Sequence, residues 1–303
     1  MSLLLAILVW FLDRIPERAL GLAARLLRLF WFDLFRYRRR VILENLAQAF
    51  PEKTAAERQA LARRAAQHLS LTLLETLRIG REIQLGLGRN VRVIGFEHLL
   101  AAARSGRGVI VVGAHYGSFE LVSGVLCHQL KDVIRCALVV KSFSPAFDRT
   151  LTKLRQVTGL EIIRGDDRSA AKEILKMLRE GQLVTFVIDQ NATRKQGIFV
   201  DFFGKPASTM TAAAVFAVRS KAAVIPAYVW REGPNQHVFE ALPEFDETPP
   251  EGADPVAWRT ARWTQLIEAQ IRRQPEQWLW THRRWKTRPL PLSTRTSSAP
   301  DAE

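Results

Sequence analysis

The stretch GVIVVGAHYGSFE, residues 108–120, joins an apolar run to a histidine, two small residues and a glutamate. The run VIVVGAH is almost continuously apolar, which is typical of a β-strand covered on both faces. The residues that follow, from Phe119 to Leu130, read as a helix. The stretch therefore predicts a strand that delivers His115 and Glu120 to the start of a helix.

The same alternation of strand and helix continues outward from this stretch. Strands are predicted at VRVIG on its N-terminal side, and at VIRCALVV, LVTFVID and AAVIPAYVW on its C-terminal side. Helices are predicted at EHLLAAARSG and near residues 145–157 and 169–179. This alternation predicts an α/β fold, a three-layer domain with a mostly parallel central sheet.

Three regions are expected along the chain. Residues 1–90 are expected to be helical and to anchor the protein to a membrane, with a capping-box pattern at Thr54 and Glu57. The α/β domain is expected over residues 91–290, after the glycine-containing stretch IGREIQLGLGRN. The polar residues 291–303 are expected to form a disordered tail.

The N-terminus carries two apolar segments, MSLLLAILVWFL at residues 1–12 and ALGLAARLLRLFWFDLF at residues 19–35. A helix needs about 20 apolar residues to span a bilayer, so the first segment is short. A cluster of arginines, residues 36 and 38–40, follows aromatic residues, a combination that suits lipid headgroups. We expect an uncleaved anchor that enters the bilayer or lies in it; the alternative is a buried helical hairpin.

Composition limits the class of protein and of partner. The chain has 303 residues, of which 48% are hydrophobic, so it can bury a substantial core. Its net charge of +14 favours nucleic acid, anionic lipid or an acidic protein as a partner. Cys127 and Cys136 lie in predicted core elements and are expected to be buried free thiols, and no cysteine–histidine cluster indicates a metal site.

His115 and Glu120 are the candidates for chemistry. If His115 stays in the turn and Glu120 lies in the first helical turn, Glu120 can accept a hydrogen bond from one ring nitrogen. The other ring nitrogen is then free to act as a general base. The nucleophilic elbow GxSxG is absent, so this pair suits direct transfer, in which a substrate hydroxyl attacks an activated acyl group. The alternative is that the spacing is coincidental.

The segment HYGSFE also matches the HX4(D/E) motif of glycerolipid acyltransferases. Three further blocks resemble the lipid A biosynthesis acyltransferases, the lauroyl/myristoyl late-acyltransferase family, in the same order along the chain. These blocks are RRRVILENLAQAFPEKTAAER, VIDQNATRKQGIFVDFFGKPASTMTAAAVFAVRS and PEQWLWTHRRWKTRP. The resemblance covers nearly the whole chain.

This resemblance implies a glycerolipid-acyltransferase-like fold and an enzyme on the cytoplasmic face of a bacterial inner membrane. Such an enzyme moves a fatty acyl chain from acyl carrier protein to a hydroxyl of a lipid A precursor. The resemblance assigns His115 as general base and Glu120 as its partner. No metal or cofactor is expected, because a thioester donor is already activated.

Four more residues are candidates for binding substrate. Asp189 and Gln190 end the predicted strand LVTFVID and are expected to lie beside the same pocket. Arg164 resembles the arginine with which glycerolipid acyltransferases meet a phosphate, and Lys205 is a second candidate for a phosphate. The alternatives are a turn cap for Asp189 and a surface ion pair for Arg164.

Two other functions remain open from the sequence. One is the same chemistry on another acceptor, such as a phosphatidylinositol mannoside or an aminolipid. The other is a non-catalytic basic module that binds membranes or nucleic acid, suggested by the Trp- and Arg-rich segment near the C-terminus. In the leading interpretation the partners are acyl carrier protein, a phosphorylated glycolipid and membrane lipids, and no nucleic acid is expected.

Overall fold

A central sheet of seven strands organises the protein in the computed structural model, which describes residues 3–86, 88–141, 145–233 and 235–290. The strand order is β1-β9-β8-β2-β5-β3-β4, and every neighbouring pair is parallel except β8 and β9. The expected mostly parallel sheet is therefore confirmed. The strands are β1 (Val91–Ile94), β2 (Val109–Gly113), β3 (Cys136–Val140), β4 (Glu161–Arg164), β5 (Leu183–Val187), β8 (Ala223–Gly233) and β9 (Gln236–Ala241).

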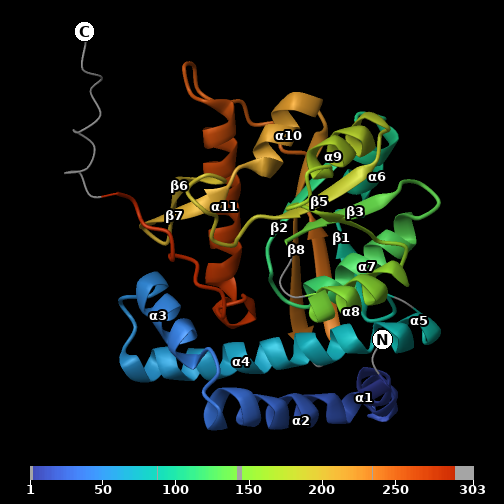
Figure 1. Ribbon diagram of the computed structural model, residues 1–303, viewed down its shortest axis with the longest axis vertical. Helices are drawn as coiled ribbons and strands as arrows, with labels where there is room; N and C mark the ends of the chain where they lie inside the picture. Colours follow the sequence, from blue (N-terminus) through green and yellow to red (C-terminus); the bar gives the residue numbers. More distant parts are fainter. Residues whose placement is uncertain (1–2, 87, 142–144, 234, 291–303) are drawn as a thin grey trace.

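The sheet is covered on both faces, as the apolar character of β2 requires. Successive side chains of a strand point to opposite faces, and Ile110 and Val112 enter one core while Val109 and Val111 enter another. The first core is closed by α9 (Ala170–Arg179), α10 (Ala212–Ser220) and α11 (Pro255–Arg273). The second core is closed by α6 (Phe96–Arg104) and α7 (Phe119–Leu130). Figure 1 shows this three-layer arrangement.

A two-stranded hairpin lies beside the sheet and packs against α11. It consists of β6 (Gly197–Phe202) and β7 (Lys205–Met210), which are antiparallel. Phe203 occupies its turn with a φ of 57°, a left-handed conformation that is rare for a bulky residue. Its ring packs edge-on against Phe50 and lies over Trp280, and these contacts hold it in this conformation.

The N-terminal quarter of the chain is helical, as predicted. It contains α1 (Leu3–Arg14), α2 (Glu17–Arg28), the π-helical turn η1 (Leu29–Leu34), α3 (Arg39–Ala49), α4 (Ala55–Leu77) and α5 (Ile79–Gln84). The capping box is confirmed at the start of α4, where Thr54 and Glu57 bond each other's backbone N–H groups. In Figure 1 these helices form the base of the molecule, and the carboxyl ends of the parallel strands point toward them.

In the described part of the chain, every helix is too short or too polar to cross a bilayer. The expected membrane anchor is therefore not supported by a spanning helix. The alternative of a fully buried hairpin also fails. Leu20 and Ala24 of α2 are buried against α4, but Leu22 and Leu26 on the other side of α2 are exposed. The expected tail, residues 291–303, lies outside the described residues.

Both cysteines are free and buried, as expected. The remaining elements are α8 (Pro145–Gln156), which follows β3, and a short 3-10 helix η2 (Pro275–Gln277), which follows α11. The chain after η2 runs back across the carboxyl edge of the sheet, and this brings it to the residues described next.

Candidate active site

The site is built where two neighbouring parallel strands end. In the register of β2 and β5, Gly113 lies opposite Val187. His115 and Asp189 each follow two residues later, so the two side chains leave the same edge of the sheet side by side. The carboxyl edge of a parallel sheet is where open α/β folds bind their ligands.

His115 and Asp189 make two hydrogen bonds with each other. The ring Nδ1 of His115 lies 2.8 Å from Oδ1 of Asp189, and the backbone N–H of His115 donates to Oδ2 at 3.0 Å. The indole Nε1–H of Trp278 donates to the same Oδ2 at 2.6 Å. The carboxylate is sealed from solvent, since only 2% of its side chain is exposed.

These contacts keep the Asp189 carboxylate ionised despite its burial. Burial alone would raise the pKa of Asp189. The charge on His115 and the hydrogen bonds from His115 and Trp278 act in the opposite direction, and the pKa lies below its ordinary value. A fixed negative charge beside Nδ1 favours the tautomer that carries its proton there.

The second ring nitrogen of His115 faces away from Asp189 and toward Gln190. With Nδ1 donating to Asp189, Nε2 presents a lone pair, and the amide nitrogen of Gln190 lies 3.3 Å from it. The His115 side chain is 20% exposed, in contrast to Asp189. An imidazole held in this way can accept a proton from a substrate hydroxyl and later return it.

The predicted contact between His115 and Glu120 is wrong. His115 is in the turn and Glu120 is in the first turn of α7, as expected, but the carboxylate points toward α8. There it forms a two-pronged ion pair with Arg155, in which Nε donates to Oε2 at 2.8 Å. Arg155 satisfies both oxygens of Glu120, and the place beside His115 is taken by Asp189.

A C-terminal segment, residues 275–287, which we call the strap, lies against the carboxyl ends of β2 and β5 and completes the site. Besides the bond from Trp278 to Asp189, the backbone N–H of Leu279 donates to the carbonyl of His115 at 3.1 Å. The amide of Asn45 in α3 donates to two strap carbonyls, those of Trp280 at 2.8 Å and His282 at 2.6 Å. The three blocks of sequence that carry the family resemblance therefore meet at one place.

Two further groups fix the strap to the chain after β5. The backbone N–H of Asn191 donates to Nε2 of His282 at 3.0 Å. Burial lowers the pKa of His282 to about 4, so its ring is neutral near pH 7 and can accept this bond. The guanidinium of Arg284 is fully buried and donates to the carbonyl of Ser208 at 2.7 Å and to the hydroxyl of Thr209.

Of the other residues predicted to bind substrate, Gln190 lies at the site, whereas Arg164 and Lys205 do not contact His115. Arg164 is exposed at the end of β4, the edge strand, and two strands separate it from β2. Lys205 starts β7 at the tip of the hairpin. Thr209, near the other end of β7, contacts the strap, and it lies four residue positions along the strand from Lys205, or about 14 Å.

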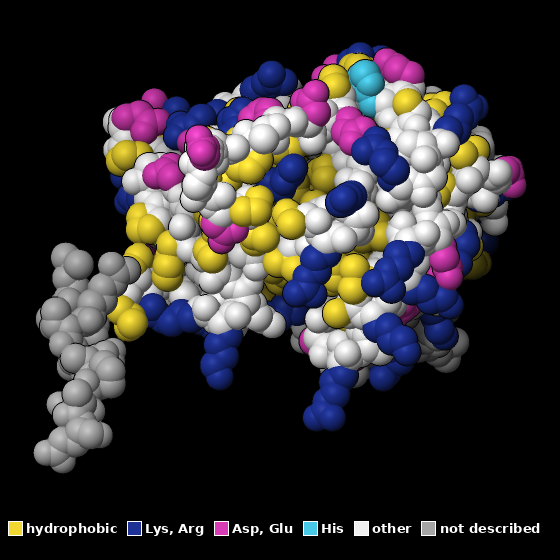
Figure 2. All heavy atoms as spheres, turned by 90° about the horizontal axis from the view of Figure 1, so that it is seen from above, with side chains coloured by type: hydrophobic (Ala, Val, Ile, Leu, Met, Phe, Trp, Pro, Cys, Tyr) yellow, Lys and Arg dark blue, Asp and Glu magenta, His cyan; other side chains and the backbone are white. Residues whose placement is uncertain are grey.

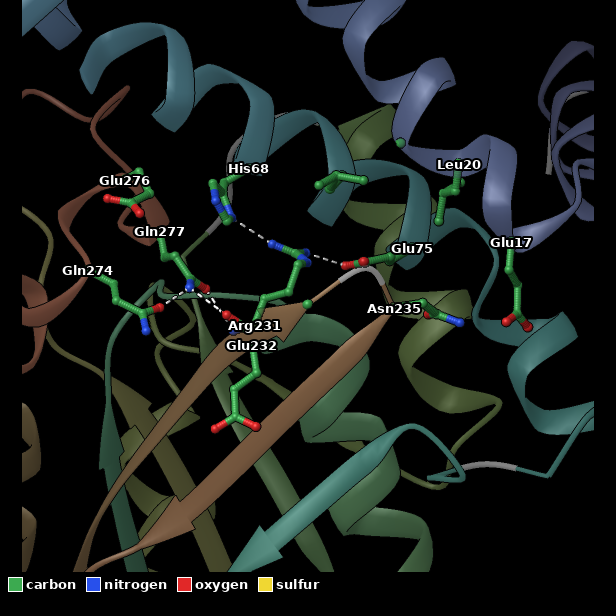
Figure 3. A pocket seen from close by; sticks show the side chains of 13 residues that line it. Glu17, Leu20, His68, Glu75, Arg231, Glu232, Asn235, Gln274, Glu276 and Gln277 are labelled. Carbon is green, nitrogen blue, oxygen red and sulfur yellow. Dashed lines mark hydrogen bonds and ion pairs between the residues drawn. The ribbon is translucent and has the colours of Figure 1, made fainter. Parts of the chain in front are cut away.

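A second polar cluster lies behind the turn that carries His115. Arg231 of β8 donates to Glu75 of α4 at 2.6 Å and to Nδ1 of His68 at 2.9 Å, as drawn in Figure 3. The hydroxyl of Ser118 also donates to Glu75 at 2.6 Å, and Thr72 donates to the carbonyl of Gly117 at 3.0 Å. These bonds tie the turn after His115 to α4.

A cavity of about 510 Å³ opens onto this second cluster rather than onto the His115–Asp189 pair. Its walls come from α2, α4, the β8–β9 hairpin and η2, and His68, Arg231 and Gln277 line it (Figure 3). Gln277 links the two regions, because it bonds the backbone of Arg231 in both directions, at 2.7 and 2.8 Å, and accepts from the N–H of Gly117 at 3.0 Å.

The sequence missed the strap residues as parts of the site. The Trp- and Arg-rich segment near the C-terminus suggested binding to membranes or nucleic acid, whereas Trp278 within it donates to Asp189. Two tryptophans of the strap lie at alternate positions, 278 and 280, and both are buried. The buried indole N–H of Trp278 has its acceptor in Asp189, and no pattern in the sequence indicates this partner.

The chain is similar to known acyltransferases over most of its length. The chain is 28% identical over 262 residues to the lipid A biosynthesis lauroyltransferase of Escherichia coli (strain K12), covering 85% of this chain and 82% of that protein. It is 27% identical over 259 residues to the lipid A biosynthesis palmitoleoyltransferase of the same organism, covering 84% and 80%. A phosphatidylinositol mannoside acyltransferase of Mycobacterium tuberculosis (strain CDC 1551 / Oshkosh) is 28% identical over 197 residues, covering 64% and 60%.

Residues 1–287, which include the helical base, the sheet and the whole strap, match the family described as bacterial lipid A biosynthesis acyltransferase. The non-catalytic alternative is thereby set aside, and the chain is an acyltransferase that belongs to the bacterial lipid A biosynthesis acyltransferase family.

Proposed function

We propose that the protein transfers a fatty acyl chain from acyl carrier protein to a hydroxyl of a lipid A precursor, with His115 as the general base. The observation that carries this proposal is the hydrogen bond of 2.8 Å between His115 and the buried Asp189, which leaves Nε2 available. The names of the relatives support the class of acceptor.

The reaction needs only groups that this site and its substrates supply. His115 Nε2 takes the proton from the acceptor hydroxyl as the oxygen attacks the thioester carbonyl. The carbon–sulfur bond breaks, an ester forms, and the departing thiolate takes the proton from the imidazolium. Asp189 stabilises the imidazolium in between and holds the ring in one tautomer.

Glu120 acts in this scheme as a positioning residue. Its ion pair with Arg155 joins the first turn of α7 to α8, and both side chains are nearly buried, at 10% and 13% exposure. Because Phe119 of the same turn packs edge-on against the His115 ring, a shift of α7 would move the imidazole.

The remaining substrate groups are assigned by charge and location. Gln190 lies beside Nε2 and orients the acceptor hydroxyl. Arg164 and Lys205 take phosphates of the acceptor that extend beyond the reacting hydroxyl, since a lipid A precursor is larger than the dyad. The net charge of +14 favours an acidic donor protein and a phosphorylated lipid. In this proposal the enzyme works at the cytoplasmic face of a bacterial inner membrane.

A phosphatidylinositol mannoside is the second candidate acceptor. The match to the mycobacterial phosphatidylinositol mannoside acyltransferase favours it, although that match covers a smaller part of the chain than the lipid A relatives do. The chemistry at His115 is the same for both acceptors.

The decisive experiment is a transfer assay with purified protein, acyl carrier protein loaded with fatty acid, and each acceptor in detergent, read by mass spectrometry. His115→Ala is expected to lower kcat by about 10³-fold. His128→Ala, in the last turn of α7, is the matched control and is expected to retain full activity. Undiminished transfer by folded His115→Ala would remove His115 as the base.

A further inference from the structure

The cavity of about 510 Å³ is separate from the catalytic pair. Neither His115 nor Asp189 lines it, and its walls come from α2, α4, the β8–β9 hairpin and η2 (Figure 3). Its volume lies within the range of pockets that hold small molecules, about 300–1,000 Å³. The proposed reaction gives it no role. We call it the α2–α4 cavity.

The glutamates of the α2–α4 cavity are mostly neutralised within the protein. Four glutamates line it, and three of them form ion pairs with arginines. The pairs are Glu17 with Arg89, Glu75 with Arg231, and Glu232 with Arg92. The fourth, Glu276, has no hydrogen bond or ion pair within the part of the chain that the structure describes. One carboxylate is therefore left for a ligand.

The cavity offers no free positive charge. Among the described residues, Arg231 is the only Lys or Arg that lines it, and its two terminal nitrogens bond His68 at 2.9 Å and Glu75 at 2.6 Å. A phosphate or carboxylate would find no free guanidinium there and would meet Glu276. The outer surface differs, because the chain carries a net charge of +14 and Figure 2 shows Lys and Arg side chains spread over the face seen from above. The overall charge therefore does not select the ligand of this cavity.

Uncharged hydrogen-bonding groups line the cavity together with Glu276. Burial and the charge of Arg231 lower the pKa of His68 to about 4, so its ring is neutral near pH 7. Because Nδ1 of His68 accepts from Arg231, its Nε2 carries the hydrogen and is a donor. The amide oxygen of Gln274 accepts from Gln277, which leaves the amide nitrogen of Gln274 as a second donor. In Figure 3, His68, Gln274 and Glu276 lie at the same end of the cavity.

The remaining wall is apolar and has an open rim. Leu20 of α2 and Leu71 of α4 line the cavity, and Gly21 lies at its exposed rim. Glycine weakens a helix relative to alanine. At Gly21 neither the backbone nor packing requires it, because its φ is outside the left-handed region and an added Cβ would meet no atom within 4 Å. The missing side chain leaves room for a ligand to enter.

We propose that the α2–α4 cavity binds an uncharged, hydroxyl-rich ligand, namely a sugar ring. A hydroxyl group both donates and accepts, so it can donate to Glu276 and accept from His68 or Gln274. The C–H groups of the ring would pack on Leu20 and Leu71. A dissolved sugar and the sugar headgroup of a glycolipid share this chemistry. The proposal does not rest on the proposed function.

A sugar in this cavity would lie against a residue that holds the turn after His115. Gln277 lines the cavity, and its carbonyl accepts from the backbone N–H of Gly117 at 3.0 Å. We therefore expect a bound sugar to slow hydrogen exchange at the Gly117 amide at least threefold. Unchanged exchange at Gly117 when the sugar is bound would place the sugar elsewhere and overturn the assignment of the cavity.

The test uses saturation-transfer NMR on the full chain in a zwitterionic detergent, with glucose, butyl glucoside and glucose 6-phosphate as probes. We expect glucose to bind, and glucose 6-phosphate to bind at least ten times more weakly. Equal affinity for glucose and butyl glucoside would indicate a dissolved sugar, and higher affinity for butyl glucoside a glycolipid headgroup. Both results support the proposal.

Two variants test the location of the site. Glu276→Ala combined with Gln274→Ala should lower the affinity for glucose at least tenfold, whereas Glu251→Ala, in the exposed turn before α11, should not change it. Gly21→Trp should also lower it, by narrowing the rim. Gly80→Trp is the matched control, because a Cβ at Gly80 of α5 also meets no atom within 4 Å and Gly80 does not line the cavity.

Three further results would overturn the proposal: no binding of glucose to the unmodified chain, binding of glucose 6-phosphate as tight as that of glucose, or unchanged affinity for glucose in both cavity variants. The first two need no variant to fold. The proposed function is judged separately. If glucose binds as expected but no acceptor is acylated, the sugar site stands and the assigned reaction fails; acylation without glucose binding gives the reverse result.

Discussion

Two clusters in this protein contain a histidine and a buried carboxylate, and they differ in the group that is hydrogen-bonded to the histidine ring. His115 donates to Asp189 and leaves Nε2 beside a neutral amide at a partly exposed position. In the other cluster, Arg231 donates to both His68 and Glu75, so the permanent charge of its guanidinium balances the Glu75 carboxylate.

The electrostatics of the two clusters follow from this difference. Burial and the charge of Arg231 lower the pKa of His68 to about 4, which makes it a permanent acceptor near pH 7. Asp189, by contrast, is buried without an arginine bonded to it. Burial raises its pKa, and the charge of His115 with the hydrogen bonds from His115 and Trp278 lowers it below its ordinary value. A shifted pKa alone does not identify a catalytic group; a free nitrogen facing a site does.

The largest effect should come from Asp189→Asn. Losing the carboxylate removes the group that selects the tautomer and stabilises the imidazolium, so kcat is expected to fall by about 10³-fold with little change in KM. Glu120→Gln should reduce kcat by about tenfold or less, because Arg155 and not His115 loses its partner. Steady-state kinetics on both folded variants checks the order. A greater loss in Glu120→Gln would restore Glu120 as the partner of His115.

The second cluster should respond in stability. Glu75→Gln leaves the buried guanidinium of Arg231 without its counter-charge and should lower the free energy of unfolding by about 3–5 kcal/mol. Adding Arg231→Met should recover much of that loss, because no buried charge remains. Denaturant titration measures both. The exposed pair of Arg107 and Glu244 is the control, and Glu244→Gln should cost less than about 1 kcal/mol. A similar loss of unfolding free energy in Glu75→Gln and Glu244→Gln would contradict the distinction between a buried and an exposed ion pair.

The smallest effect is a dependence of stability on pH. His68 binds a proton near pH 6.5 when unfolded and only near pH 4 when folded. The unfolded state therefore binds more protons between these values, and stability falls as pH drops from 6.5 to 4. His282 adds a contribution in the same window. His68→Gln should remove the contribution of His68, so that the free energy of unfolding falls by roughly 3 kcal/mol less across this window. An unchanged slope in the variant would show that His68 is not buried as described.

The sequence predicted the parts of the site that depend on local patterns. The apolar run before His115, the helix after Ser118 and the strand before Asp189 all follow from short-range periodicity, although β5 ends at Val187, two residues earlier than expected. The partner of His115 depends on which strand lies beside β2 and in what register, and that is a tertiary property. Once Gly113 is known to face Val187, the pairing of His115 with Asp189 follows by counting two residues along each strand.

Other contacts lay beyond the reach of the sequence for similar reasons. The first helical turn of α7 was predicted correctly, but the direction of Glu120 is decided by Arg155, 35 residues away. Trp278 reaches Asp189 from 89 residues away, and nothing in the spacing of either motif encodes this. The sequence predicted that His115, Asp189 and Gln190 lie at one pocket, but it did not show which groups bond each other, and it missed Trp278.

The position of the strap in the chain has a consequence for how the protein is made. Residues 275–287 leave the ribosome after the sheet and the helical base, yet they supply the bonds to His115, Asp189 and Asn45. A nascent chain can therefore form its scaffold early and still lack a finished catalytic centre. Acyl transfer would switch on only after residues 275–287 have been translated, and a transcript cut short before Trp278 would yield a chain without the indole that holds Asp189.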